Sequence, residues 1–259
     1  MSQVVVVVPA RDESGSVAAT VRDVAVSVDL ARHRGLVSGS AIEVVAHRCL
    51  DDTADRARAA LAGRADATVT RDHDSVSVGQ VRDRGVRRAL PRLDDRPGDT
   101  WVLSTDADTR VGATWVTDIL TEAARTRVVA VVGLAPLDAW RGSDIARTAY
   151  AAVLAEKMRD DPVHQHDHVY GANLAVRADA YLAVGGFSHL VHGEDQRIVD
   201  DLDRHGFPLL RTRHVTVTTS GRLRGRAVEG LAAHLARLDL DPVPWSALSP
   251  VPVGTDERS

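Results

Sequence analysis

An unbroken run of five valines at residues 4–8 constrains the fold more than any other feature of the chain. A strand with one face in water alternates apolar and polar residues, whereas a strand covered on both faces is apolar throughout. The run therefore predicts a central strand of a parallel sheet, with other elements packed on both sides. Because Pro9 has no backbone N–H, we expect the strand to end there.

Short apolar runs, polar loops and helical patterns then alternate along the first half of the chain. Strands are expected at residues 42–45, 67–69 and 101–103, and helices at about 17–28, 54–61 and 80–90. Such repeats form right-handed βαβ units. We therefore predict an α/β fold, with a doubly wound, mainly parallel sheet flanked by helices in a single domain.

The second half continues with less regular spacing. Strands are expected at residues 128–133, 169–176 and 215–219, and helices at about 145–158, 177–184, 192–206 and 228–238. We assign residues 1–241 to one domain. Residues 242–259 are rich in Pro, Ser and Gly, so we expect a loosely ordered tail there.

Charge and cysteine content narrow the possible partners. The net charge of −4 gives no reason to expect a nucleic acid or an anionic membrane. Cys49 is the only cysteine, so no disulfide can form within the chain. No apolar stretch is long enough to span a bilayer, and we expect no transmembrane segment. We expect a cytoplasmic protein, leave peripheral attachment to a membrane open, and keep a homodimer as one option.

Asp106 and Asp108 follow the strand expected at residues 101–103. Side chains two residues apart in an extended chain point to the same side. Two neighbouring carboxylates suit a hard cation, so the pair predicts a Mg²⁺ or Mn²⁺ site that could hold a diphosphate. The simpler alternative is a solvated acidic turn.

Three polar loops, at residues 9–13, 47–51 and 105–108, each follow an expected strand. In doubly wound sheets, ligands bind outside the carboxyl ends of the strands. The three loops therefore predict one ligand site at that edge of the sheet. No Gly-X-Gly-X-X-Gly sequence follows the first strand, which argues against a dinucleotide-dependent dehydrogenase.

Five short motifs occur in order along the chain, at residues 5–13, 51–54, 104–109, 171–177 with 185–187, and 193–195. Together they resemble the family 2 glycosyltransferases, which have the nucleotide-diphospho-sugar transferase fold, GT-A. The resemblance covers about residues 4–226 and implies a nucleotide-binding half over about 1–110 and an acceptor half over 111–241 of the domain. It implies a metal-dependent hexosyltransferase that moves a sugar from a UDP- or GDP-sugar to a hydroxyl of a small-molecule or lipid-linked acceptor.

The resemblance also implies roles for the matching residues. Residues near the donor would be Pro9, Ala10, Arg11, Glu13, Asp51, Gly79, Arg82 and Asp106. Asp108 would ligate the metal directly, and Asp106 would touch the ribose or a metal-bound water. Asp195 would be the general base, with Glu194 orienting the acceptor or the base. Residues on the acceptor side would be Gly171 and Asn173.

Further candidates come from side-chain chemistry. Arg222 and Arg224 could grip the diphosphate in bidentate fashion, with a solvated loop as the alternative. Trp140 could be a sugar platform or a packing residue. His214, or the His-rich loop at residues 164–168, could contribute to the site. Many family members carry an acidic residue near position 46 that contacts the nucleobase. In this chain Ala46 and His47 occupy that position, so the sequence does not predict which nucleobase the donor carries.

An inverting displacement is the expected mechanism, because a carboxylate within hydrogen-bond reach can take the proton of an attacking hydroxyl. A retaining transferase resembling the glucosyl-phosphoglycerate synthases remains an alternative. A nucleotidyltransferase is disfavoured because the loop at residues 9–13 has no glycine. A catalytically silent module that binds nucleotide sugars is the remaining alternative.

Overall fold

The computed structural model describes residues 1–94, 96–138 and 143–221 of the chain. Two compact units are present, and the larger comprises Met1–Trp140 and Arg159–Gly221. The described element of the smaller unit is helix α5 (Asp144–Glu156). Trp140, Arg222, Arg224, the helix expected at 228–238 and the tail at 242–259 lie outside the described residues.

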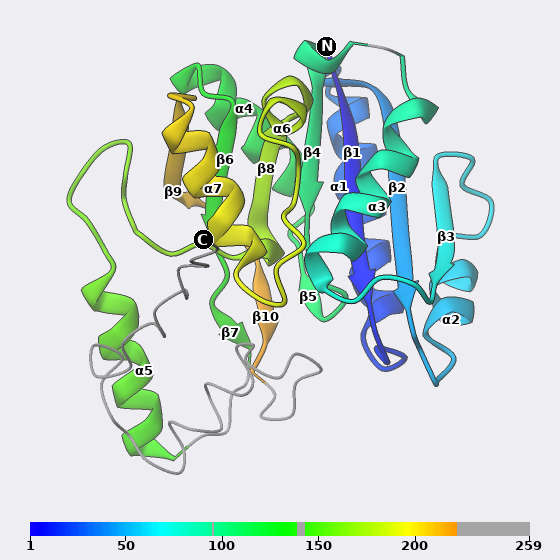
Figure 1. Cartoon of the computed structure of the whole chain (residues 1–259), viewed down its shortest axis with the longest axis horizontal. Helices are drawn as coiled ribbons and strands as arrows, with labels where there is room; N and C mark the ends of the chain where they lie inside the picture. The colour runs from blue at the N-terminus through cyan, green and yellow to red at the C-terminus, as the bar shows by residue number, and fades with distance from the viewer. Residues whose placement is uncertain (95, 139–142, 222–259) are drawn as a thin grey trace, which may run out of the picture. The chain divides into compact units, whose positions relative to one another are not determined.

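A seven-stranded sheet forms the centre of the larger unit (Figure 1). Its strands are β1 (Ser2–Ala10), β2 (Val37–His47), β3 (Ala67–Asp72), β4 (Thr100–Ser104), β6 (Ala130–Leu134), β8 (Leu174–Arg177) and β9 (Leu209–Thr216). The order across the sheet is β3-β2-β1-β4-β8-β6-β9. β8 runs antiparallel to β4 and β6, and every other neighbouring pair is parallel. The predicted mainly parallel α/β sheet is confirmed.

A second, three-stranded sheet lies beyond the carboxyl edge of the first. It joins β5 (Thr109–Arg110), β10 (Thr218–Ser220) and β7 (Leu137–Asp138) in the order β5-β10-β7. Thr219 pairs with Thr109 across the antiparallel β10–β5 ladder. The end of the described chain is thereby held beside the turn that carries Asp106 and Asp108.

Helices cover both faces of the large sheet. They are α1 (Val17–His33), α2 (Thr53–Ala60), α3 (Val78–Ala89), α4 (Trp115–Thr126), α6 (Ala178–Ala183) and α7 (Glu194–Arg204). Short 3-10 turns are η1 (Leu90–Arg92), η2 (Pro97–Asp99) and η3 (Gly171–Asn173). Val4, Val6 and Val8 pack in one core with α1 and α4, whereas Val7 packs in the other with α3, α6 and α7. Burial of the valine run on both faces is therefore confirmed.

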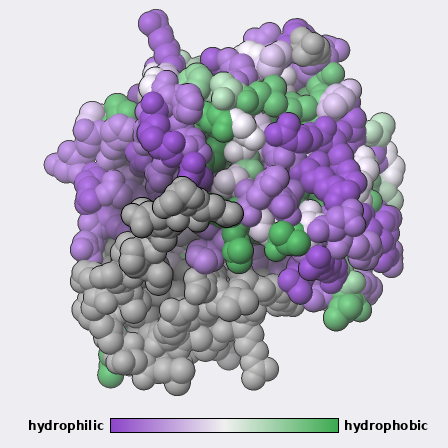
Figure 2. Space-filling view, viewed as in Figure 1, coloured by the Kyte–Doolittle hydropathy of each residue, from purple (hydrophilic) through white to green (hydrophobic). Residues whose placement is uncertain are grey.

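The surface seen from the α3 and α7 side is mostly hydrophilic, and its apolar side chains form separate small patches (Figure 2). Each helix on this face buries one side and presents polar residues on the other, as an amphipathic helix does. In the described part of the chain, no helix is both long enough and apolar enough to cross a bilayer.

Three strand predictions were wrong in detail. β1 continues through Pro9 to Ala10, because the ladder with β4 ends at Val7 and Pro9 borders only β2. The strand expected at residues 169–176 is instead η3 followed by the shorter β8. The strand expected at 215–219 begins earlier, at Leu209, and is interrupted before β10.

The side chain of Asn173, which lies in η3 just before β8, forms hydrogen bonds with residues of β6, β9 and α4. Its Nδ2 donates to Leu134 O at 2.8 Å and to Val215 O at 3.1 Å, and its Oδ1 accepts from Trp115 Nε1 at 2.9 Å. Both ends of the amide are thus used inside the protein, and its role toward an acceptor stays a prediction. Gly133 makes room for this contact.

Replacing Gly133 by Ala should destabilise the fold by about 1–3 kcal/mol or more, since overpacked cores lose that much. A Cβ there would lie 2.2 Å from Asn173 Nδ2 and 2.4 Å from the backbone oxygen of Val215. Urea unfolding measures the loss. Gly112→Ala is the matched control, because a Cβ at Gly112 meets no atom within 4 Å. Equal stabilities of the two variants would contradict the packing described.

Candidate active site

The carboxyl ends of β1, β2 and β4 lie at one edge of the sheet (Figure 1), and hydrogen bonds join the segments that follow β1 and β2. Leu50 N donates to Asp12 Oδ1 at 2.7 Å, and Ser14 N donates to Asp51 Oδ2 at 3.1 Å. Thr20 in α1 donates through Oγ1 to Ala107 O at 3.0 Å. The three polar loops predicted to meet at this edge do so.

Asp51 anchors two of these loops through its carboxylate. One oxygen accepts from Ser14 N, and the other accepts from the backbone and the hydroxyl of Thr53. Although burial opposes ionisation, these hydrogen bonds lower the pKa of Asp51 to about 2. Asp51 is therefore an ionised loop anchor, and its contact with a donor stays a proposal.

Arg82 is the buried centre of the site. It comes from α3, is 3% exposed, and reaches the edge of the sheet between β4 and α7. Its Nη1 donates to Ser104 Oγ at 2.7 Å, its Nη2 to Asp106 Oδ1 at 2.6 Å, and its Nε to Glu194 Oε1 at 3.3 Å. One guanidinium therefore joins the acidic motif after β4 to the acidic motif at the start of α7.

Burial and the neighbouring charges shift the pKa of Arg82 and that of Glu194. Burial opposes the charge of Arg82, but Asp106 and Glu194 outweigh it and raise the pKa of Arg82, which stays protonated. Burial raises the pKa of Glu194, and Asp195 and Asp106 add to the effect against the attraction of Arg82. The buried Glu194 thus takes up a proton more readily than a carboxyl group in water.

Asp195 lies half-buried in the first turn of α7, next to Glu194. Its Oδ2 accepts from Gly171 N at 2.8 Å, and its Oδ1 accepts from Gln196 N at 2.8 Å. Gly171 itself lies against Arg82, since a Cβ there would be 2.6 Å from Arg82 Nη2. The proposed base and the Asp106 motif are therefore connected through Arg82 and Gly171.

Gly79 lets the segment before α7 close on α3. A Cβ on Gly79 would lie 2.0 Å from Ser188 O and 3.0 Å from Glu194 Cβ. Because Gly79 has no Cβ, the backbone oxygen of Ser188 can approach it closely, and this oxygen fills the space that a side chain would occupy. Contact of Gly79 with a nucleotide stays a prediction.

The remaining donor-side residues occupy the loop after β1. Pro9 and Ala10 are buried, and Arg11 is exposed. Glu13 is buried, and its carboxylate accepts from Ser16 Oγ at 3.0 Å. Arg11 is therefore the side chain of this set that is most open to a ligand.

Asp106 and Asp108 flank the turn between β4 and β5, and both are half-buried. Two carboxylates fit Mg²⁺ or Mn²⁺, because such ions keep waters and substrate phosphates as their other ligands. The described residues hold one trio of possible ligands within 4.8 Å of one another, namely Asp12, Cys49 and Asp51. Asp12 and Asp51 in that trio already accept backbone N–H groups, and burial raises the pKa of the Cys49 thiol.

Sequence reasoning missed the residues that hold the segment before α7. Tyr181 Oη donates to Asp83 Oδ1 at 2.8 Å and accepts from Phe187 N at 3.2 Å. Asp83 Oδ2 also accepts from Arg87 Nε at 2.6 Å. Gly185 and Gly186, both with positive φ, were the visible signal of a tight turn, but nothing in the sequence pairs Tyr181 with Asp83.

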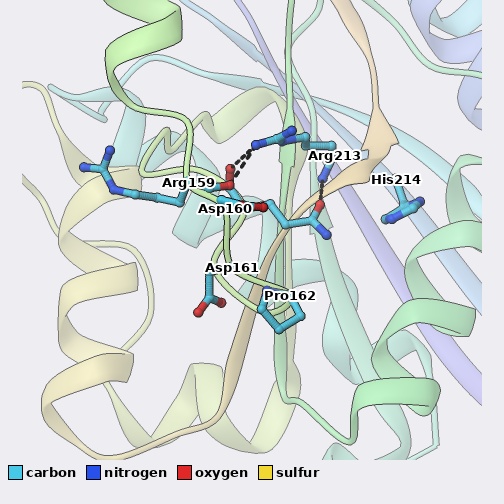
Figure 3. Close-up of a pocket in the computed structure, with 7 residues that line it drawn as sticks. Arg159, Asp160, Asp161, Pro162, Arg213 and His214 are labelled. Atoms are coloured by element: carbon cyan, nitrogen blue, oxygen red, sulfur yellow. Dashed lines mark hydrogen bonds between the residues drawn. The ribbon is translucent and has the colours of Figure 1, made fainter.

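A separate cavity of about 400 Å³ lies beside β9 (Figure 3). The residues that line it are Arg159, Asp160, Asp161, Pro162, Gln165, Arg213 and His214. Arg213 Nη2 donates to Arg159 O at 2.8 Å, which fixes one wall. His214 is one of these lining residues, and none of them belongs to the acidic motifs.

The His-rich loop packs against β9. His166 is fully buried, with Nδ1 at 3.1 Å from His168 O and Nε2 at 3.2 Å from Thr212 O. His168 stacks on Tyr170 with ring centroids 5.6 Å apart. His166 and His168 thus have packing roles.

The sequence matches no known family model and no curated relative. Solved structures are similar in fold. A mannosyltransferase from Pyrobaculum calidifontis, in complex with GDP-Man and Mn²⁺, has a TM-score of 0.61 at 18% identity, covering 92% of this chain and 61% of that one. A Staphylococcus aureus TarS fragment has a TM-score of 0.58 at 12% identity, covering 84% and 60%.

Glucosyl-3-phosphoglycerate synthase from Mycobacterium tuberculosis, in complex with Mn²⁺, UDP-Glc and phosphoglyceric acid, has a TM-score of 0.54 at 18% identity. The alignment covers 92% of this chain and 77% of that one. At such identities the likeness establishes the fold, and the chain has the GT-A fold that the sequence motifs implied. This chain spans about three fifths of the TarS fragment and of the mannosyltransferase.

Replacing Arg82 by Met should destabilise the protein by about 3–5 kcal/mol, because the buried carboxyl group of Glu194 loses its cation. Urea unfolding at neutral pH measures the effect. Arg56→Met is the matched control, since Arg56 and Asp52 form an exposed pair worth about 0–1 kcal/mol. Similar losses in both variants would mean that Arg82 does not hold the site together.

Proposed function

We propose that this protein is a metal-dependent glycosyltransferase that moves a sugar from a UDP- or GDP-sugar to an acceptor hydroxyl. The observation that carries the proposal is the contact of one buried guanidinium with both Asp106 and Glu194. A transferase of this kind needs one acidic group near the diphosphate and another near the acceptor. Arg82 brings two such groups to the same edge of the GT-A sheet.

Asp108 and Asp106 would hold the Mg²⁺ or Mn²⁺ ion beside the donor. The ion supplies charge neutralisation for the departing nucleotide diphosphate. Arg82 holds one oxygen of Asp106 and so fixes the direction in which that carboxylate points. Arg222 and Arg224, which follow β10 in the chain, remain proposed partners of the diphosphate.

Asp195 would accept the proton of the acceptor hydroxyl as it attacks the sugar. Two backbone N–H groups orient its carboxylate, and its side chain remains half-buried. Glu194, whose Oε1 is held by Arg82 Nε, would orient the acceptor or the base. This division of roles corresponds to an inverting displacement with a carboxylate as general base.

A retaining transfer is the second candidate. This alternative rests on the fold shared with glucosyl-3-phosphoglycerate synthase over 77% of that chain. Under this alternative Asp195 would position the sugar or acceptor without taking the proton. The anomeric configuration of the product, read by NMR, separates the two mechanisms.

Removal of the metal should abolish turnover. We expect donor hydrolysis or transfer to stop in excess EDTA and to return when Mn²⁺ or Mg²⁺ is added. Nucleotide sugars should also raise the melting temperature more with the metal than without it, because a ligand stabilises the folded state that binds it. Full activity in EDTA would contradict the proposal.

Asp195→Asn should lower turnover by at least about a hundredfold, the usual contribution of a general base, while donor affinity stays nearly unchanged. Steady-state rates and donor titrations measure the two effects. Asp200→Asn is the matched control, because Asp200 is an exposed residue of the same helix. An equal loss of donor affinity in Asp195→Asn would move Asp195 to the nucleotide side of the site.

A further inference from the structure

Tyr181 lies in α6 and is fully buried, and its hydroxyl group makes two hydrogen bonds. Its Oη donates to Asp83 Oδ1 in α3 at 2.8 Å and accepts from Phe187 N at 3.2 Å. Burial and the charge of Asp83 raise the pKa of Tyr181, so the hydroxyl keeps the proton that it donates. The acidic motifs contain neither Tyr181 nor Asp83, and the proposed transfer chemistry gives them no role.

Both oxygens of the buried Asp83 carboxylate are held in place. Oδ2 accepts from Arg87 Nε at 2.6 Å, one turn further along α3. Oδ1, which accepts from Tyr181, fills the space that a side chain on Gly186 would need, since a Cβ there would lie 2.4 Å away. Gly186 has a φ of 83°, which glycine adopts at little cost. The carboxylate, the tyrosine hydroxyl and the turn at Gly186 therefore form one unit.

Phe187 connects this unit to Arg82. Its backbone N–H donates to Tyr181 Oη, and its ring meets the Tyr181 ring edge to face, with centroids 5.7 Å apart. The guanidinium carbon of Arg82 lies 5.9 Å from the centre of the Phe187 ring, where a cation is attracted to the aromatic face. Phe187 is 3% exposed, and a closely packed ring cannot move aside. The position of Phe187 therefore limits where the guanidinium can lie.

The same turn also leads to the start of α7. Ser188, which follows Phe187, places its backbone oxygen against Gly79 of α3. Helices α3, α6 and α7 cover one face of the large sheet and share one core (Figure 1). Arg82 contacts both acidic motifs. A shift of Phe187 would therefore reach the site by two routes, through the guanidinium and through the segment that precedes α7.

We propose that Tyr181 and Asp83 are positioning residues for the transfer reaction. Their hydrogen bond holds Phe187 against Arg82 and so keeps the carboxylates of both acidic motifs in their working arrangement. Both side chains are buried, so they act through Phe187 and Arg82 rather than by contact with a substrate. The inference rests on the proposed function, because it concerns the same reaction.

Tyr181→Phe removes only the hydroxyl group and tests the inference. The assay is hydrolysis or transfer of UDP-glucose, UDP-N-acetylglucosamine or GDP-mannose with Mn²⁺. We expect kcat to fall by at least about tenfold while the donor KM changes by less than about twofold, because small misplacements of reacting groups cost that much or more. The KM should hold because the substitution leaves the loops after β1 and β2 unchanged.

Ser27→Ala is the matched control. Ser27 Oγ accepts from Val116 N at 2.9 Å and is fully buried, as Tyr181 is, but it joins α1 to α4 in the other core. Both substitutions thus remove a buried hydroxyl that accepts a backbone N–H. They should lower the melting temperature by similar amounts, whereas only Tyr181→Phe should lower kcat.

Substitutions of Asp83 provide a rescue test. Asp83→Asn keeps a side-chain oxygen that can accept from Tyr181 Oη, so kcat should stay within about threefold of wild type. Asp83→Ala removes the acceptor and should match Tyr181→Phe. In the variant that combines Tyr181→Phe with Asp83→Ala, the two losses of kcat should not add, since both substitutions break the same bond.

The Nε–H of Arg82 gives a readout that does not depend on turnover. It is buried and donates to Glu194, so it should appear as a slowly exchanging signal in a proton–nitrogen NMR spectrum. The signal is identified by its loss in Arg82→Met. It should shift or broaden in Tyr181→Phe and stay in place in Ser27→Ala.

The outcomes separate this inference from the proposed function. If wild type turns over a donor and Tyr181→Phe keeps its kcat, the inference is overturned and the proposed function stands. An equal loss of kcat in Ser27→Ala, or an unmoved Arg82 signal in Tyr181→Phe, would also overturn it. If wild type turns over none of the donors, the proposed function fails and the inference fails with it. A loss of kcat confined to Tyr181→Phe and Asp83→Ala, with a moved Arg82 signal, supports it.

Discussion

The buried guanidinium of Arg82 is the interaction on which the rest of the site depends. Three of its nitrogens each contact a different side chain, and these come from β4, the turn after β4, and α7. A cation this deeply buried is tolerated only when it is paired and hydrogen-bonded, and two carboxylates and a hydroxyl meet that need. The same contacts place two acidic motifs that are far apart in the sequence at one point.

The sheet topology explains why Arg82 can make these contacts. The valines of β1 bury both faces, so helices cover each side and the chain must pass through loops at the carboxyl edge. The antiparallel β8 follows η3, which puts Gly171 at the same edge, against Arg82 and Asp195. Gly79 and Ser188 then bring the start of α7 onto α3. The fold thus assembles an acidic edge from both halves of the chain.

Much of this could be predicted from the sequence, because the strongest signals were local. The valine run identified the central strand, and the helices over α1, α2, α3 and α7 followed their apolar spacing. The strand was expected to end at Pro9 because proline cannot donate a backbone hydrogen bond. The sequence does not show that the pairing with β4 ends before Pro9, so that this donor is not needed. The segment at residues 169–176 was misread because Gly171 and Asn173 are shaped by distant partners, Arg82 and Trp115, rather than by strand propensity.

The site was predicted as residues in separate roles, and the structure adds the bonds between them. Arg82 was expected near a nucleotide, and its use as a bridge between Asp106 and Glu194 depends on tertiary contacts. A double-mutant cycle tests this central claim most directly, with urea unfolding free energies of wild type, Asp106→Asn, Glu194→Gln and the double variant. Because both carboxyl groups share one guanidinium, the account predicts a coupling of about 0.5–3 kcal/mol between the two substitutions. Strictly additive effects would contradict it.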